Sequence, residues 1–130
     1  MELPADLQYT REHEWVQIDG KTATIGITDH AQEQLGEVVF VELPAVGDRV
    51  ERGDPFGVIE STKAVSDVYA PLAGEVIEVN DDLPENPEML NEDPYGDGWM
   101  VKFVLTDPDD KEGLMSSEEY AQFVEEPEED

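Results

Sequence analysis

Cysteine is absent from this chain of 130 residues. Its absence excludes disulfides, thiolate nucleophiles and thiolate metal ligands together, so any sulfur chemistry would need a cofactor. Basic residues are scarce as well, because seven Lys and Arg face 34 Asp and Glu and give a formal net charge of −27. Nucleic acids and anionic membrane surfaces are therefore disfavoured as partners, since both are bound through clustered Lys and Arg.

Long hydrophobic runs are also missing. No stretch approaches the roughly eighteen apolar residues of a membrane span. The first six residues have neither a basic region nor an apolar stretch, so they do not resemble a secretory signal. We expect a cytoplasmic protein with a single domain over residues 1–130, ending in an acidic, disordered tail at 125–130.

The acidity has two possible origins. An acidic surface could serve a basic partner, or it could be an adaptation to a salt-rich cytoplasm, where screening suppresses self-repulsion. The acids are spread along the whole chain, which favours adaptation to salt and predicts a halophilic, archaeal source. The melting temperature should then rise with salt concentration, and a melting temperature that did not rise would contradict this account.

Hydrophobic patterning predicts a mainly β protein with a few short helices. Alternation and turn signals mark the strands, while capping residues such as Thr28, Asp29 and Gly36 mark a helix. The expected elements are strands at 13–18 and 21–27 joined by a turn at Asp19 and Gly20, a helix at 28–36, a strand at 37–43, a hairpin region at 46–79, a loop at 81–94, a strand at 99–105, a helical turn at 107–110 and a last helix begun by a capping box at Ser116 and Glu119.

Lys63 is the most informative residue of the chain. Runs rich in β-branched residues precede it and follow it, and small polar residues lie between them. This pattern is typical of a tight hairpin with Lys63 at its tip, where the side chain extends into solvent. The chain has only four lysines, so an exposed one in a short turn indicates more than a role in solubility.

Two glycines give the segment around Lys63 an internal symmetry. Gly47 lies sixteen residues before Lys63 and Gly74 lies eleven after it, each in a turn-like context that leads into a strand-like run. The segment therefore consists of two similar halves folded about Lys63. This arrangement resembles the lipoyl/biotinyl carrier fold, in which a modified lysine lies at a hairpin tip.

Further blocks narrow the resemblance to the H proteins of the glycine cleavage system. Thr62 departs from the family, in which Val is common at that position. The similarity covers residues 7–126 and implies a barrel-sandwich hybrid of two small antiparallel sheets, with short flanking helices and a C-terminal helix. The matching blocks are YTREHEWV (9–16), ATIGITDHAQ (23–32), LG (35–36), VFVELP (39–44), ESTKA (60–64), AP (70–71), GEV (74–76) and NEDPYGDGW (91–99).

The resemblance implies a carrier that does not itself catalyse. Lys63 would carry lipoate in amide linkage, attached by enzymes that recognise Glu60, Ser61 and Ala64. The P protein, a pyridoxal-phosphate enzyme, would decarboxylate glycine and transfer the aminomethyl group to the lipoyl arm. The T protein would pass the methylene to tetrahydrofolate and release ammonia, and the L protein, a dihydrolipoamide dehydrogenase, would reoxidise the arm. One surface meeting several partners in turn suggests a monomer.

The resemblance also implies a cleft that shelters the loaded arm. Its cationic amine calls for carboxylate or carbonyl partners, and Glu14 and Asp67 are the candidates for the cleft. The family often has His at the position of Gln34 and small residues such as Ser near Glu12, so the polar lining of the cleft differs in this chain.

Other functions fit the residues less well. A biotin carrier normally has its lysine between two methionines, which Thr62 and Ala64 do not match. A lipoyl domain of a 2-oxoacid dehydrogenase usually has Asp before the lysine, and a lipoate-relay paralogue outside glycine cleavage stays open. An enzyme is disfavoured because the chain lacks a nucleophile–base pair or a phosphate loop. His13 and His30 have no third ligand spaced to complete a metal site.

Overall fold

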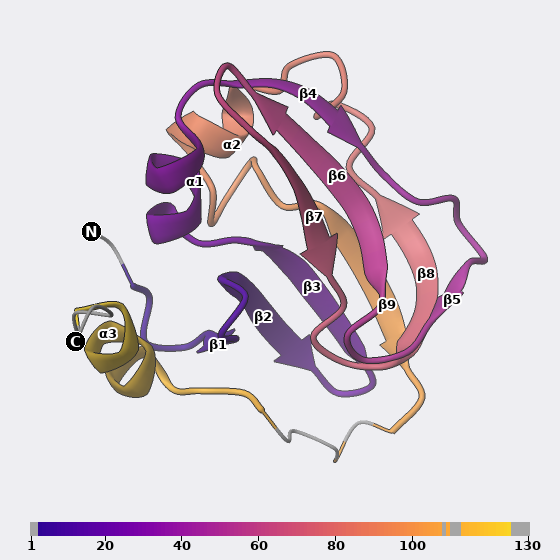
Figure 1. Ribbon diagram of the computed structural model, residues 1–130. Coiled ribbons are helices and arrows are strands. Elements are labelled where there is room, and N and C mark those ends of the chain that lie inside the picture. The colour runs from indigo at the N-terminus through magenta and orange to yellow at the C-terminus, as the bar shows by residue number, and fades with distance from the viewer. Residues whose placement is uncertain (1–2, 108, 110–112, 126–130) are drawn as a thin grey trace.

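The computed structural model describes residues 3–107, 109 and 113–125 (Figure 1). Two antiparallel sheets carry the fold, as the sequence predicted. The large sheet has the order β1-β2-β3-β9-β8-β5, and the small sheet has the order β4-β6-β7. The strands of the large sheet are β1 (Gln8–Tyr9), β2 (Glu14–Asp19), β3 (Thr22–Ile27), β9 (Val101–Leu105), β8 (Gly74–Val79) and β5 (Arg49–Val50); those of the small sheet are β4 (Val38–Glu42), β6 (Pro55–Ser61) and β7 (Val65–Tyr69).

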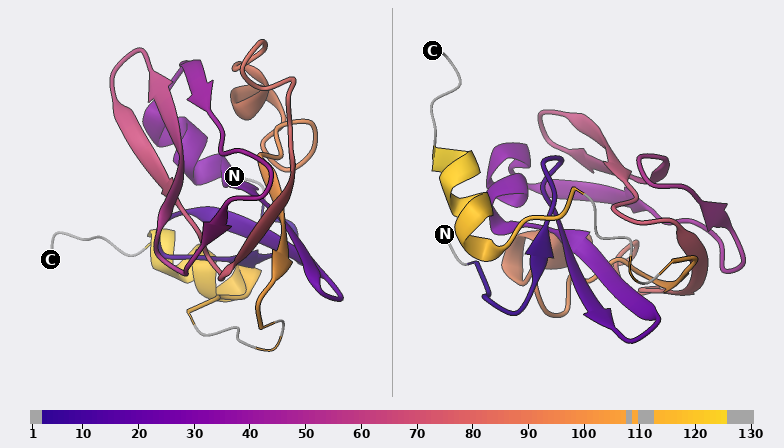
Figure 2. Two further views of the ribbon diagram at one scale, coloured as in Figure 1. Left: turned by 90° about the vertical axis from the view of Figure 1, so that its right-hand side faces the viewer. Right: turned by 90° about the horizontal axis from the view of Figure 1, so that it is seen from below.

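The main core lies between the two sheets, which form separate layers in Figure 2. The large sheet contributes Ile25 and Phe103, and the small sheet contributes Val41 and Ile59, all at most 1% exposed. Strand side chains alternate between faces, so the inward residues of each strand meet those of the opposite sheet. Phe56 and Phe103 pack edge to face across this interface, with ring centroids 5.8 Å apart.

A smaller aromatic cluster joins the two ends of the chain. Helix α3 (Ser117–Glu125) packs beside β1 in Figure 2, and the rings of Tyr9 and Tyr120 stack at 4.9 Å. The predicted capping box starts this helix, because the Ser116 hydroxyl accepts from Glu119 N while the Glu119 carboxylate accepts from Ser116 N. Within the described part of the chain α3, with nine residues, is the longest helix, and no helix is long and apolar enough to cross a membrane.

The two predicted halves around Lys63 lie side by side in the structure. The segments that follow the two turns pair as β5 and β8, with Val50 opposite Gly74. Gly47 N donates to Val76 O and Val76 N donates to Asp48 O, both at 2.8 Å. These two hydrogen bonds tie the two halves together at the end of the domain away from Lys63.

The β2–β3 hairpin differs from prediction at both ends. Asp19 pairs with Thr22, so the turn residues are Gly20 and Lys21 instead of Asp19 and Gly20. Gly20 has a φ of +63°, and a glycine at the first central position is the requirement of a type II′ turn. His13 lies outside the strand because its φ of +72° breaks the extended run, and β2 begins at Glu14.

The Pro and Asn content of the segment at 81–94 predicted a loop, but the segment also contains a helix. This helix is α2 (Met89–Glu92). Two leucines of the segment, Leu83 and Leu90, are fully buried. Two isolated leucines among polar residues give no periodic signal, although their burial folds the segment onto the core. Helix α1 (Asp29–Leu35) is confirmed, with the Thr28 hydroxyl accepting from Ala31 N as its N-cap.

The remaining differences concern chain ends and strand limits. Strand β1 was not predicted, because two residues are too short for a pattern. Strand β9 starts at Val101, two residues later than expected. Residues 108 and 110 of the predicted helical turn, and residues 126–130 of the predicted tail, lie outside the described residues, whereas Glu125 ends α3.

Candidate functional site

Lys63 lies exposed in the three-residue turn between β6 and β7. The Ser61 hydroxyl organises this turn by accepting hydrogen bonds from Lys63 N at 3.2 Å and Ala64 N at 3.1 Å. Ser61 N donates to Ala64 O at 2.8 Å and closes the hairpin. A short polar side chain at the first position therefore shapes the turn that presents the lysine.

The stem of Lys63 lies against the end of α1. A Cβ atom added to Gly36 would be 3.3 Å from Lys63 Cε and 3.9 Å from Nζ. Thr62 N donates to Glu37 O at 3.0 Å, which joins the turn to the residue after Gly36. The turn thus lies at the end of the molecule that holds α1 and α2 (Figure 1). Sequence reasoning assigned Gly36 only to the helix end and missed this contact with the lysine.

A small cleft opens between α1, β7 and the start of β2. Its volume is about 150 Å³, and it holds both predicted cleft residues, Glu14 and Asp67. Glu12 and Gln34, the two positions at which the chain departs from the expected family pattern, also line it. The remaining lining residues are His13, Ile27, Ala31, Leu35, Ile59, Ser66 and Val68.

Glu14 is the buried carboxylate of this cleft, with only 2% of its surface exposed. Thr10 Oγ1 donates to Oε1 at 2.5 Å, and Tyr69 N donates to Oε2 at 3.1 Å. Burial raises the pKa of Glu14 to about 7, although the hydrogen bonds from Thr10 and Tyr69 oppose the rise. The carboxyl group therefore lies in a fixed orientation and can change its charge near neutral pH.

His13 forms a wall of the cleft that sequence reasoning missed. Its φ of +72° is unusual for a residue other than glycine, and such backbone strain often occurs at functional sites. His13 Nδ1 lies 2.7 Å from the Tyr120 hydroxyl, which in turn lies 2.8 Å from Thr28 Oγ1. Helix α3 thus supports the cleft wall through one hydroxyl, and burial raises the pKa of Tyr120 above its ordinary value. No local pattern signals this link, because it joins residues far apart in the sequence.

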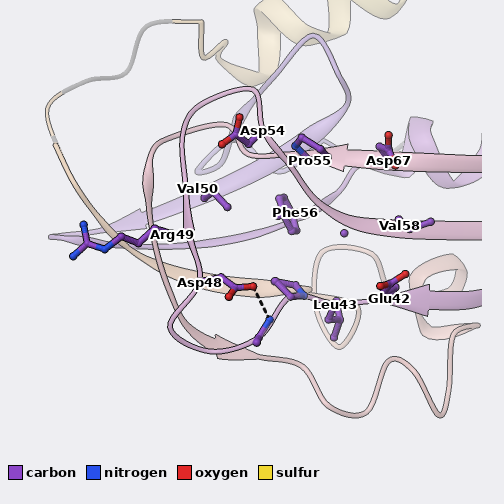
Figure 3. Close-up of a pocket in the computed structure, with 13 residues that line it drawn as sticks. Glu42, Leu43, Asp48, Arg49, Val50, Asp54, Pro55, Phe56, Val58 and Asp67 are labelled. Carbon is purple, nitrogen blue, oxygen red and sulfur yellow. Dashed lines mark hydrogen bonds between the residues drawn. The ribbon is translucent and has the colours of Figure 1, made fainter.

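Two other pockets lie near the cleft. One of about 130 Å³ shares Glu12 and Glu14 with it, so these residues separate two small cavities. A larger pocket of about 680 Å³ surrounds the start of β6 (Figure 3). Asp67 borders both the larger pocket and the cleft, but Lys63 lies at the other end of β6. Position next to the exposed lysine, not size, makes the small cleft the candidate site.

The sequence-predicted site residues divide into two groups in the structure. Glu60, Ser61, Lys63 and Ala64 occupy the end of the hairpin. Glu14 and Asp67 lie in the cleft, on strands of different sheets. Strand β7 links the groups, since it starts two residues after Lys63 and carries Asp67.

Comparisons with known proteins agree with the geometry. The model of the glycine cleavage H-protein family matches residues 7–127. The chain is 61% identical to the glycine cleavage system H protein of Rubrobacter xylanophilus and 59% identical to that of an Anaeromyxobacter species. These alignments cover 98% of this chain in both cases, and 98% and 100% of the respective relatives.

A solved structure has the same fold. The crystal structure of a glycine cleavage system H protein from Mycobacterium marinum superposes with a TM-score of 0.85, at 40% sequence identity, over 93% of this chain and 98% of that one. These relatives are bacterial, so they do not support the prediction of a halophilic archaeal source. Sequence, fold and the exposed hairpin lysine lead to one conclusion, that the chain belongs to the glycine cleavage H-protein family.

Proposed function

We propose that this chain is the lipoyl-bearing shuttle of the glycine cleavage system, with lipoate attached to Lys63. It carries the aminomethyl group of glycine from the P protein to the T protein and is then reoxidised by the L protein. The observation that carries the proposal is an exposed lysine at a hairpin tip, next to a cleft with a buried carboxylate. The protein acts as a non-catalytic carrier in the cytoplasm, where a tethered substrate reaches three enzymes at high effective concentration.

Lys63 fits the attachment of lipoate. Its side chain is exposed at a turn ordered by Ser61, so the ammonium group is open to an acylating enzyme. Lipoate linked to Nζ would supply a dithiolane, whose disulfide accepts the aminomethyl group together with the electrons released by decarboxylation. The missing side chain at Gly36 leaves room for the lysine stem to lie along the end of α1.

The cleft fits the sheltering of a cationic amine. Glu14 and Asp67 provide carboxylates, and Glu12 adds a third acidic side chain to the lining. An amine brought close to Glu14 would favour the ionised carboxylate and lower the pKa that burial has raised. The ion pair would form away from bulk water, where it protects a hydrolysis-prone group. Gln34 contributes a neutral polar group at this place.

Recognition by the attaching enzyme uses the end of the hairpin. Ser61 sets the turn, and Ala64, next to Lys63, has only a methyl side chain. Glu60 is half-buried in the strand that leads into the turn, where its carboxylate can pair with a basic side chain of the enzyme.

Mass spectrometry of the protein from its native host tests the attachment. Trypsin cuts after an unmodified Lys63, whereas lipoylation blocks that cut and leaves a single peptide of residues 53–102 with one lipoyl increment. An unmodified Lys63 in cells that degrade glycine would contradict the proposal, and a biotin increment would indicate carboxylase chemistry. Adding the loaded protein to purified P protein and glycine then separates the two lipoyl functions, because a relay paralogue would not support decarboxylation.

A further inference from the structure

Two lysines in the described part of the chain lie at hairpin turns, and only one is proposed to carry lipoate. Lys21 is exposed in the turn between β2 and β3, and Lys63 is exposed in the turn between β6 and β7. An attaching enzyme that recognised only an exposed lysine in a turn would modify both. The surroundings of Lys63 must therefore offer a contact surface that those of Lys21 lack.

The outer face of the small sheet carries such a surface next to Lys63. Phe40, Glu60 and Val65 are direct cross-strand neighbours on β4, β6 and β7, so their side chains form one row on one face. A register shift between Val38 and Phe40 leaves Val39 exposed beside this row. We term the four residues Val39, Phe40, Glu60 and Val65 the tip patch.

The tip patch concentrates exposed apolar side chains. Val39, Phe40 and Val65 are 49%, 45% and 68% exposed, and they are three of the five large hydrophobic residues exposed in the described part of the chain. The other two, Val46 and Ile77, lie in the β4–β5 connection and on β8. The β2–β3 hairpin, which is described completely, has none. Single exposed hydrophobic residues are normal, but a cluster indicates an interaction surface.

The reach of lysine suggests which partner needs this surface. Attachment acts on Nζ of Lys63 itself, at the end of a four-carbon stem. The hairpin end must therefore come into direct contact with the attaching enzyme. Enzymes that act on the dithiolane meet it at the far end of the added arm, so the sheet can stay farther from them. We therefore expect the attaching enzyme to bury the residues immediately beside the turn to a greater extent than the enzymes that act on the dithiolane.

We infer that the tip patch is the docking surface for the lipoate-attaching enzyme. This inference rests on the proposed function and assigns the specificity for Lys63 over Lys21 to Phe40, Val39 and Val65, with Glu60 at the centre. Glu37 and Glu42 are exposed at the two ends of β4, so acidic groups flank the patch. The complementary enzyme surface has an apolar centre with basic side chains around it.

In vitro lipoylation tests the inference. The apo form of the full chain is incubated with lipoate, ATP and a lipoate–protein ligase, and intact mass gives the initial rates. Phe40→Ser should lower kcat/KM about ten-fold, mainly through KM, and Val65→Thr about three-fold. Ile77→Thr is the matched control on another sheet and should stay within about two-fold of wild type. Val65→Thr keeps a β-branched side chain in the strand, so it remains informative if Phe40→Ser unfolds.

The outcomes separate this inference from the proposed function. If the wild type is never modified, both fail together. If the wild type is modified and the patch variants react equally fast, only the docking surface is wrong. Variants loaded with excess ligase are then assayed with the glycine cleavage enzymes, where rates near wild type are expected. A loss confined to that second assay would assign the patch to the turnover enzymes and overturn the inference.

Discussion

The β2–β3 and β6–β7 hairpins present the same residue in different surroundings. Lys21 lies in a two-residue turn with Gly20. The space around this turn is open, because no atom lies within 4 Å of a Cβ placed on Gly20. Lys63 lies in a longer turn, and its stem rests on Gly36 beside the cleft. Exposure at a turn is therefore shared, whereas the neighbouring helix end and cleft belong to only one hairpin.

The two hairpins also contribute opposite ends to the candidate site. The β6–β7 hairpin provides its tip, with Lys63, while β2 provides its first residue, Glu14, at the base of the other hairpin. One group is exposed in a turn, and the other is buried and fixed by Thr10 and Tyr69. The proposed shuttle would use both properties, since its tether would have to move while the shelter stays in place.

The largest difference between the hairpins should appear when their lysines are exchanged for arginine. Lys63→Arg should abolish lipoylation and glycine-dependent shuttling, because a guanidinium remains protonated and does not form the amide. Its melting temperature should stay near that of wild type, since the side chain is exposed. Lys21→Arg is the matched control and should leave both activities unchanged. Residual glycine decarboxylation that depends on the Lys63 variant would contradict the assignment of Lys63 as the attachment site.

A second test concerns the buried end of the site. The raised pKa of Glu14 means that the native state binds its proton more tightly than the unfolded chain does. The stability contributed by this proton is complete below the unfolded pKa of 4.5 and is lost as the pH rises to about 7. Glu14→Gln should therefore reduce the difference in unfolding free energy between pH 5 and pH 8 by about 2–3 kcal/mol.

Urea unfolding at the two pH values in high salt measures this change. High salt reduces the contribution of the many surface acids. Glu85→Gln is the control, because Glu85 is exposed and is not among the groups that shift the pKa of Glu14. An unchanged pH dependence in Glu14→Gln would show that Glu14 is ionised in the folded protein at pH 5.

Matched glycine substitutions sharpen the comparison further. Gly36 and Gly20 both have positive φ, at +80° and +63°, so alanine should cost about 1–2 kcal/mol of stability at each. Only Gly36→Ala also places a Cβ atom 3.3 Å from Lys63 Cε. Thermal melts should shift for both variants, whereas the rate of lipoylation should fall for Gly36→Ala alone. Equal lipoylation rates for the two variants would show that Gly36 does not help to place the lysine.

The smallest expected effect concerns the side chains that shape the two turns. Ser61→Ala removes the hydroxyl that accepts from Lys63 N and Ala64 N and should cost about 0.5–1 kcal/mol. Thr22→Val removes a hydroxyl that donates to Asp19 O in the other turn, with a similar cost. Urea midpoints give the stabilities, and lipoylation should slow only for Ser61→Ala. A normal rate there would mean that the backbone alone sets the turn.

Local signals in the sequence were sufficient for much of the fold. Alternation located β2, β3 and β9, the Ser116 and Glu119 pair located the start of α3, and Thr28 located the start of α1. These signals work because a strand or a helix end is stabilised by residues a few positions apart. Helix α2 escaped detection, since Leu90, its one buried residue, packs in a core built by distant segments and gives no local pattern.

The sequence by itself determined the element that carries the site, a hairpin with Lys63 at its tip between two symmetric halves. Only the tertiary structure decided what lies beside it: Gly36 under the lysine stem, His13 in the cleft wall and the burial that raises the pKa of Glu14. The physical reason is the distance along the chain between the residues that interact. Turn formation depends on neighbouring residues, whereas desolvation and the shape of a cleft depend on which distant segments the packing of the two sheets brings together.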